Sequence, residues 1–250
     1  MENCSGDLYL VDAHTHIQPD EEEAARRLAQ QGLWQLVAAT NPDECARIAA
    51  LASSESRIIF TAGLHPWYSA AHSPDTMDDW LQQAPVIGEI GLDTVWTDAP
   101  LEQQRVAFLY QLQRAVVLQK PVILHTKGAE AEILTWLERY TPPLVIVHWY
   151  SGPAELLPGY QALGCYFTLG PDLEQNPAQQ AVCRQVAPDR LLTETDGSGA
   201  VAWATGCPSL LQDTPQVLRR ILNTAARTRG IAPEELQAAV QRNLLRLLGI

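Results

Sequence analysis

Eight short apolar runs recur along the whole chain, and amphipathic, helix-like stretches separate them. Two of the runs, residues 121–124 and 144–147, are apolar throughout, as strands covered on both faces of a parallel sheet are. The predicted strands are residues 9–16, 34–39, 57–62, 86–90, 122–125, 145–148, 165–169 and 191–195. This alternation predicts the α/β class and a (β/α)8 TIM-like barrel. An open, doubly wound sheet is less favoured, because no Gly-x-Gly-x-x-Gly follows the first strand.

Four predicted helices begin with an N-cap side chain followed by a proline at the first helical position. These pairs are Asn41-Pro42, Ser73-Pro74, Asn176-Pro177 and Thr214-Pro215. The longest helix is expected over residues 100–118, with an inward face of Val106, Leu109, Leu112 and Val116. Helices over residues 215–229 and 233–248 should follow the last strand. No domain boundary interrupts this pattern, so residues 1–250 are predicted to form a single domain.

The unusual polar residues fall where the predicted strands end, which is where barrels of this kind carry their chemistry. Five of the six histidines lie there, namely His14, His16, His65, His125 and His148. Random placement would scatter these residues along the chain. We therefore expect them to converge on one mouth of the barrel.

The polar residues of this mouth can be sorted into two metal sites. Residues two apart on a strand face the same way, so His14 and His16 can chelate one divalent cation, together with Asp196 on the neighbouring eighth strand. His125 and His148, on adjacent strands, could bind a second ion. Glu89, on the fourth strand, could bridge the two ions, and paired ions can hold both oxygens of a displacement and acidify water. Asp196 could orient that water or accept its proton.

Other polar and aromatic residues near the mouth have roles that the spacing leaves open. Asp12 is either a ligand or the support of a ligand, and Glu194 is a candidate for a buried partner. His65 could protonate a leaving oxygen, bind a phosphate or stabilise a turn. Lys127 could bind a phosphate or lie on the surface. Trp149 and Tyr150 could stack a base or serve in packing.

Composition restricts the possible partners and the compartment. The net charge is −12 and there are only two lysines, which argues against non-specific binding to a polyanion. The five cysteines are scattered and form no Cys-x-x-Cys pair, which is typical of reduced thiols. We see neither a signal peptide nor a run long enough to cross a membrane. The expectation is a cytoplasmic protein, monomeric or a small homo-oligomer.

Six motifs follow one another in order from the first strand to the eighth. They are Asp12-x-His14-x-His16, Gly63-x-His65-Pro66, Gly88-Glu89-Ile-Gly-Leu-Asp93, His125-x-Lys127-x-Ala129, His148-x-x-Ser151-Gly152 and Glu194-Thr-Asp196. Together they resemble the TatD family of metal-dependent hydrolases, as do Gln104-x-x-x-Phe108-x-x-Gln111 and the closing Arg242-Asn243. The resemblance implies a barrel with two divalent ions (Zn, Mg or Mn) and nuclease or phosphodiesterase activity. It also implies six metal ligands, with Glu89 bridging, namely His14, His16, Glu89, His125, His148 and Asp196.

The function predicted first is therefore a two-metal phosphodiesterase or exodeoxyribonuclease that acts on DNA or RNA ends. Its catalytic residues would be Asp196, His65 and Glu89, and its substrate-binding residues His65, Lys127 and Trp149. The loops depart from the family: Lys127 replaces an arginine, Thr94-Val95 replaces aromatic residues, and Gly197-Ser-Gly199 replaces a turn through proline. These changes leave open a small phosphoester, an amide or a lactone as substrate. A non-catalytic binding protein would be expected to have lost ligands, and all six are present.

Overall fold

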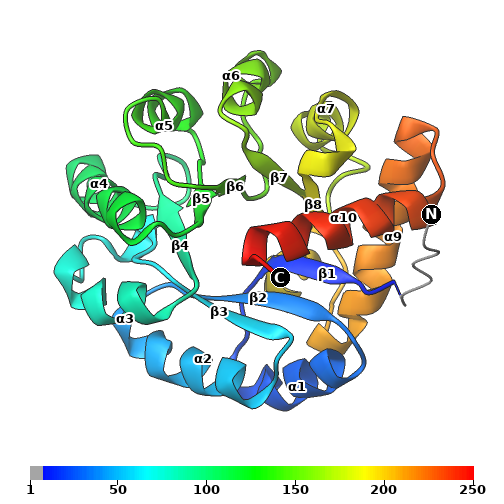
Figure 1. Ribbon diagram of the computed structural model, residues 1–250, viewed down its shortest axis with the longest axis horizontal. Coiled ribbons are helices and arrows are strands. Elements are labelled where there is room, and N and C mark those ends of the chain that lie inside the picture. The colour runs from blue at the N-terminus through cyan, green and yellow to red at the C-terminus, as the bar shows by residue number, and fades with distance from the viewer. Residues whose placement is uncertain (1–7) are drawn as a thin grey trace.

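The computed structural model describes residues 8–250, which contain eight parallel strands in sequential order (Figure 1). The strands are β1 (Val11–Thr15), β2 (Trp34–Ala39), β3 (Ile58–Ala62), β4 (Val86–Gly91), β5 (Val122–His125), β6 (Val145–Val147), β7 (Tyr166–Leu169) and β8 (Leu191–Thr193). Every predicted strand is present, and the differences are confined to strand ends. The predicted TIM-like barrel is confirmed.

Hydrogen bonds between β8 and β1 bring the two edges of the sheet together. The Thr193 hydroxyl donates to the carbonyl oxygen of Val11 at 2.6 Å, and the backbone NH of Asp196 donates to that of His14 at 3.0 Å. The buried Asp12 carboxylate accepts from the Thr195 NH at 2.8 Å and from its hydroxyl at 2.6 Å. Asp12 is thus a support that fixes the end of β8 beside the end of β1.

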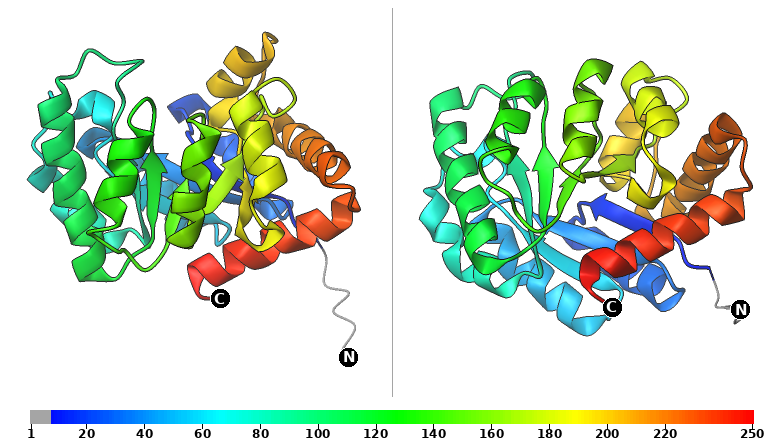
Figure 2. Two further views of the ribbon diagram at one scale, coloured as in Figure 1. Left: turned by 90° about the horizontal axis from the view of Figure 1, so that it is seen from above. Right: turned by 45° about the horizontal axis from the view of Figure 1, so that its top comes forward.

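Helices surround the strands on the outside of the barrel, except that the last helix lies across one of its ends (Figures 1 and 2). They are α1 (Glu22–Gln30), α2 (Pro42–Ser54), α3 (Asp78–Gln83), α4 (Leu101–Leu118), α5 (Glu130–Leu137), α6 (Leu157–Ala162), α7 (Pro177–Gln185), α8 (Gly197–Thr205), α9 (Thr214–Arg229) and α10 (Pro233–Leu248). The α8 helix was not expected, because its glycine-rich start reads as a loop. Within residues 8–250, no helix is both long and apolar enough to cross a bilayer.

Two of the four predicted helix caps are confirmed by hydrogen bonds. The Asn41 side chain accepts from the Asp43 NH, and the Asn176 side chain accepts from the Ala178 NH, both at 3.0 Å. Ser73 instead precedes a short 3₁₀ turn. Within the described chain, the Ser73 side chain forms no capping hydrogen bond to that turn. The predicted cap at Thr214 is wrong by one residue, since Thr214 is already helical and Asp213 precedes the helix.

The inward face of α4 differs from the predicted one. Val106 is 63% exposed, whereas Gln104 and Gln111 are buried. The Gln104 side chain bonds both the NH and the carbonyl of Asp93, at 2.8 and 2.9 Å, and Gln111 does the same to Leu64, at 2.6 and 3.1 Å. A hydrophobic pattern assigns glutamine to solvent, but here two buried amides satisfy the backbone of the loops after β3 and β4.

The C-terminal helix α10, red in Figure 1, lies at the end of the barrel where the strands begin. The Asn243 amide donates to the carbonyl oxygens of Pro188 and Leu191, both at 2.8 Å, and Gln241 accepts from the NH of Tyr9. This end of the barrel is therefore covered. The predicted site residues lie at the opposite end of the barrel, where the strands finish.

The cysteines that the structure describes carry free thiols. Cys45, Cys165 and Cys183 are buried and Cys207 is exposed. Cys4 and the rest of the N-terminal segment examined for a signal peptide lie outside the described residues.

Candidate metal centre

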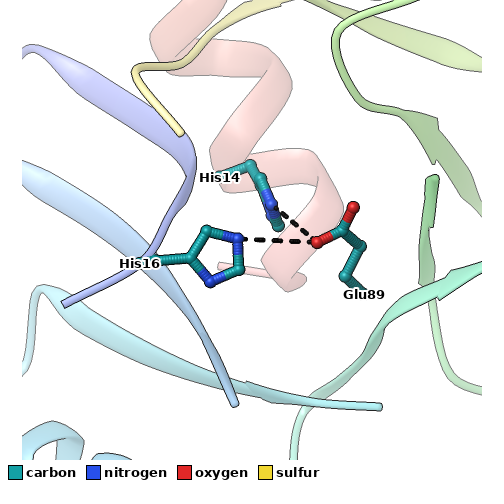
Figure 3. Close-up of side chains that lie close together, drawn as sticks. All are labelled: His14, His16 and Glu89. Carbon is teal, nitrogen blue, oxygen red and sulfur yellow. Dashed lines mark ion pairs between the residues drawn. The ribbon is translucent and has the colours of Figure 1, made fainter. Parts of the chain in front are cut away.

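Glu89 lies at the centre of the strand ends, and one of its oxygens faces the first strand. Figure 3 shows His14 and His16 both pointing at this oxygen, Oε2. The Nε2 atoms of the two rings lie 3.2 and 3.5 Å from it. The alternation of side chains along β1 therefore brings His14 and His16 to one place, as the spacing predicted.

The other oxygen of Glu89 faces three further histidines. Its Oε1 lies 2.7 Å from Nδ1 of His125, 2.8 Å from Nε2 of His148 and 3.4 Å from Nε2 of His65. Glu89 itself is only 2% exposed. The two carboxylate oxygens thus divide the histidines into two sets, which is the arrangement that a bridging carboxylate requires.

Close packing between β4 and β5 makes this central position of Glu89 attainable. Gly91, two residues after Glu89, has φ +156°, and a Cβ atom there would lie 1.8 Å from the carbonyl oxygen of His125. Only glycine allows the two strands to approach this closely. The Gly91 backbone thus sets the distance between Glu89 and the His125 ring.

Asp196 completes the set on the Oε2 side. Its Oδ1 lies 3.4 Å from Nε2 of His14 and 3.2 Å from Nε2 of His16. Its backbone is left-handed, with φ +59°, which turns the side chain back toward β1. Such a conformation is uncommon for a residue other than glycine and is concentrated at functional sites.

The atoms at this mouth form three overlapping groups of potential metal ligands. They are His14–His16–Glu89, His14–His148–Asp196 and His65–Glu89–His125. The structure therefore brings together all six predicted ligands, with His65 beside them. His148 reaches both sides of the cluster, so its predicted pairing with His125 on one ion stays a prediction.

The electrostatics of the cluster favour cations. Burial alone would raise the pKa of Glu89, but His65, His148 and His14 hold it well below the ordinary value. Burial likewise opposes protonation of His16, yet hydrogen bonds to Asp196 and Glu89 raise its pKa to about 10. The carboxylates thus stay ionised and attract positive charge, which protons or metal ions can supply.

Unpaired ring nitrogens support the same conclusion. Among residues 8–250, neither ring nitrogen of the buried His14 forms a hydrogen bond, although its Nε2 lies within ion-pair distance of Glu89 and Asp196, and Nδ1 of His148 forms none either. Buried polar atoms are rarely left without partners unless they serve a site. Imidazole nitrogens and carboxylates that converge within 4.8 Å suit divalent ions such as zinc, which would take the place of the protons on these rings. Glu194 is buried, as its candidacy for a buried partner requires, and its Oε2 lies 3.4 Å from Nδ1 of His148 without forming a hydrogen bond to it.

The residue that sequence reasoning overlooked is Asp93. Its Oδ2 accepts from Nε1 of Trp67 at 2.7 Å and lies 3.0 Å from Nε2 of His125. Its Oδ1 accepts from the backbone NH groups of Val95 and Trp96, both at 2.8 Å. One carboxylate therefore orients a predicted metal ligand and fixes the loop after β4. Asp93 belongs to one of the six motifs, but its partners Trp67 and His125 are distant in the sequence, and no local pattern predicts them.

Asp93→Ala should lower the affinity for divalent metal about 10- to 100-fold, the usual effect of losing the partner of a ligating histidine. Without the carboxylate, the His125 ring loses the contact that fixes its orientation. Competition against a chelating dye would measure the affinity. Asp98→Ala, an exposed change in the same loop, is the matched control. Equal metal affinity in the two variants would show that Asp93 does not orient a ligand.

A cavity of about 680 Å³ opens above the cluster, and the predicted substrate-binding residues line it. Lys127 is there, and its Nζ donates to the Ser151 hydroxyl at 3.0 Å. Trp149 is there also, half-buried. Tyr150 is not: it is fully buried, its hydroxyl donates to the Pro153 carbonyl, and the interpretation of it as a stacking residue is wrong.

Comparison with known proteins gives matches along nearly the whole chain. Residues 11–249 match the family model described as TatD related DNase. An uncharacterized metal-dependent hydrolase, YcfH of Escherichia coli, is 27% identical and covers 97% of both chains. A 3'-5' ssDNA/RNA exonuclease, TatD of Pantoea vagans, is 28% identical over 92% of this chain and 93% of its own. The crystal structure of YjjV, a TatD homologue of E. coli, superposes with a TM-score of 0.85 at 26% identity, covering 96% of this chain and 98% of that one.

Proposed function

The chain belongs to the TatD family of metal-dependent hydrolases, and from this premise we propose that it is an exonuclease that cleaves phosphodiester bonds at DNA or RNA ends. The observation that carries the proposal is the division of histidines between the two oxygens of Glu89. A hydrolase with one ion would need only one of these sets. We also propose that residues 1–250 work as a single domain.

The residues that would hold two ions are His14, His16, Glu89, His125, His148 and Asp196. Bound there, divalent ions would neutralise a phosphate and acidify a water molecule. The buried carboxylate of Glu89 would hold both ions, and Asp93 and Glu194 would keep the rings of His125 and His148 in orientation. Asp12, through Thr195, holds the backbone just before Asp196.

Asp196 and His65 would carry out the proton transfers of the reaction. The side chain of Asp196 is 23% exposed and can accept the proton of an attacking water. Nδ1 of His65 accepts from the Trp67 NH at 3.2 Å, so the proton of the neutral ring is on Nε2, the atom that faces the cluster. Burial lowers the pKa of His65 and so favours this neutral form. His65 would then donate to a phosphate oxygen.

Lys127 would provide the second contact to phosphate. Its ammonium group is held by the Ser151 hydroxyl at the edge of the cavity. An ammonium group binds phosphate as a point charge, without the two-pronged geometry of arginine. This agrees with a chain of strongly negative charge that binds its substrate at one local site instead of along a basic surface.

The first experiment is cleavage of a short single-stranded DNA, labelled at either end, by protein of measured metal content. We expect shortening from one end with added magnesium, manganese or zinc and none after treatment with a chelator. Restored cleavage on adding metal back would show that metal removal, and not denaturation, caused the loss. Absence of cleavage by protein that carries metal would exclude the nuclease. Small phosphoesters and cyclic amides would then be tested on the same sample.

A further inference from the structure

Three tryptophans from separate parts of the chain meet at the cavity above the metal cluster. Trp96 lies in the loop after β4, Trp149 follows β6, and Trp203 is on α8. The Trp203 ring contacts both others edge to face, with centroids 5.7 Å from Trp96 and 6.2 Å from Trp149. We call these three residues the tryptophan wall.

The outer part of the wall is open to solvent, although its inner part is held firmly. Trp203 is 67% and Trp96 50% exposed, which is unusual for adjoining large aromatic side chains. Trp149 donates from Nε1 to Asp172 at 2.9 Å, and its ring lies against Gly170, where a Cβ atom would approach it to 3.1 Å. Trp149 is thus fixed in place, and the exposed ring of Trp203 packs edge to face against it and against Trp96.

The Trp96 end of the tryptophan wall also lies next to the metal cluster. The Trp96 ring lies 6.5 Å from the ring of His125, and the Nζ atom of Lys127 lies 4.3 Å from the Trp96 centroid. A ligand that complements the cluster, Lys127 and the tryptophan rings would have an anionic end near the cluster and Lys127, and a flat apolar ring farther out. A nucleotide has both parts: a phosphate and a nucleobase joined through one sugar.

We propose that the tryptophan wall is a nucleobase subsite, with Trp203 as its specificity-determining residue. The inference rests on the proposed nuclease function and extends it: the terminal base is recognised by stacking on Trp203, while its phosphate lies at the metal cluster. A base can stack in this way only when it is unpaired. Stacking on an aromatic ring tolerates every base, so the subsite selects nucleotides without selecting sequence.

Calorimetric titration of metal-loaded protein with two probes tests the proposal. The probes are dAMP and 2-deoxyribose 5-phosphate, which differ by the base alone. We expect dAMP to bind at least about 10-fold more tightly than the sugar phosphate, and Trp203→Ala to weaken dAMP about 10-fold without affecting the sugar phosphate. Trp203→Phe should retain most of the affinity for dAMP, because a ring remains.

The control is Leu210→Ala, which removes an apolar side chain that is 62% exposed outside the cavity and should leave both affinities unchanged. Equal binding of the two probes by the unmodified protein, or an undiminished affinity of Trp203→Ala for dAMP, would overturn the subsite. The cleavage assay is a separate readout. Base-dependent binding without cleavage of DNA would reject the nuclease and keep the subsite, whereas cleavage with no base dependence would do the reverse.

Discussion

Glu89→Gln is expected to reduce hydrolysis at least about 10³-fold, more than the loss of a single transition-state hydrogen bond costs. The amide has the shape of the carboxylate but only one oxygen, and it carries no charge. Its single oxygen can therefore face one pair of histidines, either His14 and His16 or His125 and His148, but not both pairs. The bound metal should fall from the two ions per chain that we propose to one or none, which elemental analysis of the purified variant would measure.

Glu138→Gln makes the same chemical change at an exposed position on the outside of the barrel and is the matched control. It should retain both ions and full activity. Because Glu89 is buried among ring nitrogens, the variant also needs a check of folding, for which thermal unfolding with and without metal is suitable. Two ions per chain in Glu89→Gln, with unchanged activity, would reject a bridging role and with it the proposed centre.

The barrel could be predicted from the sequence because both faces of its strands are buried. Such strands appear as apolar runs, as residues 121–124 and 144–147 do, and they stand out from the amphipathic helices around them. The part that could not be predicted is α8, which begins with Gly197-Ser-Gly199. Glycine is a poor helix former, and tertiary packing, which a local pattern does not record, decides such cases.

The convergence of the candidate ligands followed from two simple rules, the alternation of side chains along β1 and the location of sites at strand ends. These two rules do not predict which side-chain atoms come into contact. The split of histidines between Oε1 and Oε2 of Glu89 depends on side-chain orientations. The four contacts of Asp93 depend on groups that folding alone brings near, including Trp67, which is 26 residues away in the sequence.

Of the tryptophan wall, only Trp149 was predicted as a substrate-binding residue. Trp96, Trp149 and Trp203 are each isolated in the sequence and have no common spacing, so nothing marks them as a group. The altered stretches at residues 94–95 and 197–199 did indicate a changed substrate region. The structure shows one consequence of that change: Trp96 directly follows the first stretch, Trp203 lies four residues beyond the second, and their rings contact each other.

Asp196→Asn should lower kcat about 10²- to 10⁴-fold, the range for loss of general acid–base catalysis, with a smaller effect on KM. Asparagine preserves the size of the side chain and is among the few residues that tolerate the left-handed backbone at this position, so the fold should be retained. The amide cannot accept the proton of an attacking water, and its lack of charge weakens the contacts to His14 and His16. Steady-state kinetics on the labelled DNA would give kcat and KM separately.

The control for this change is Asp79→Asn, an exposed aspartate on α3 that does not line the cavity above the cluster. Metal content distinguishes the two roles that Asp196 combines. If Asp196→Asn keeps both ions and still loses kcat, the carboxylate acts on the water; if it loses one ion in proportion to activity, its role is ligation. A variant with full metal and full kcat would contradict both roles, and the centre would then have to work through Glu89 and the histidines alone.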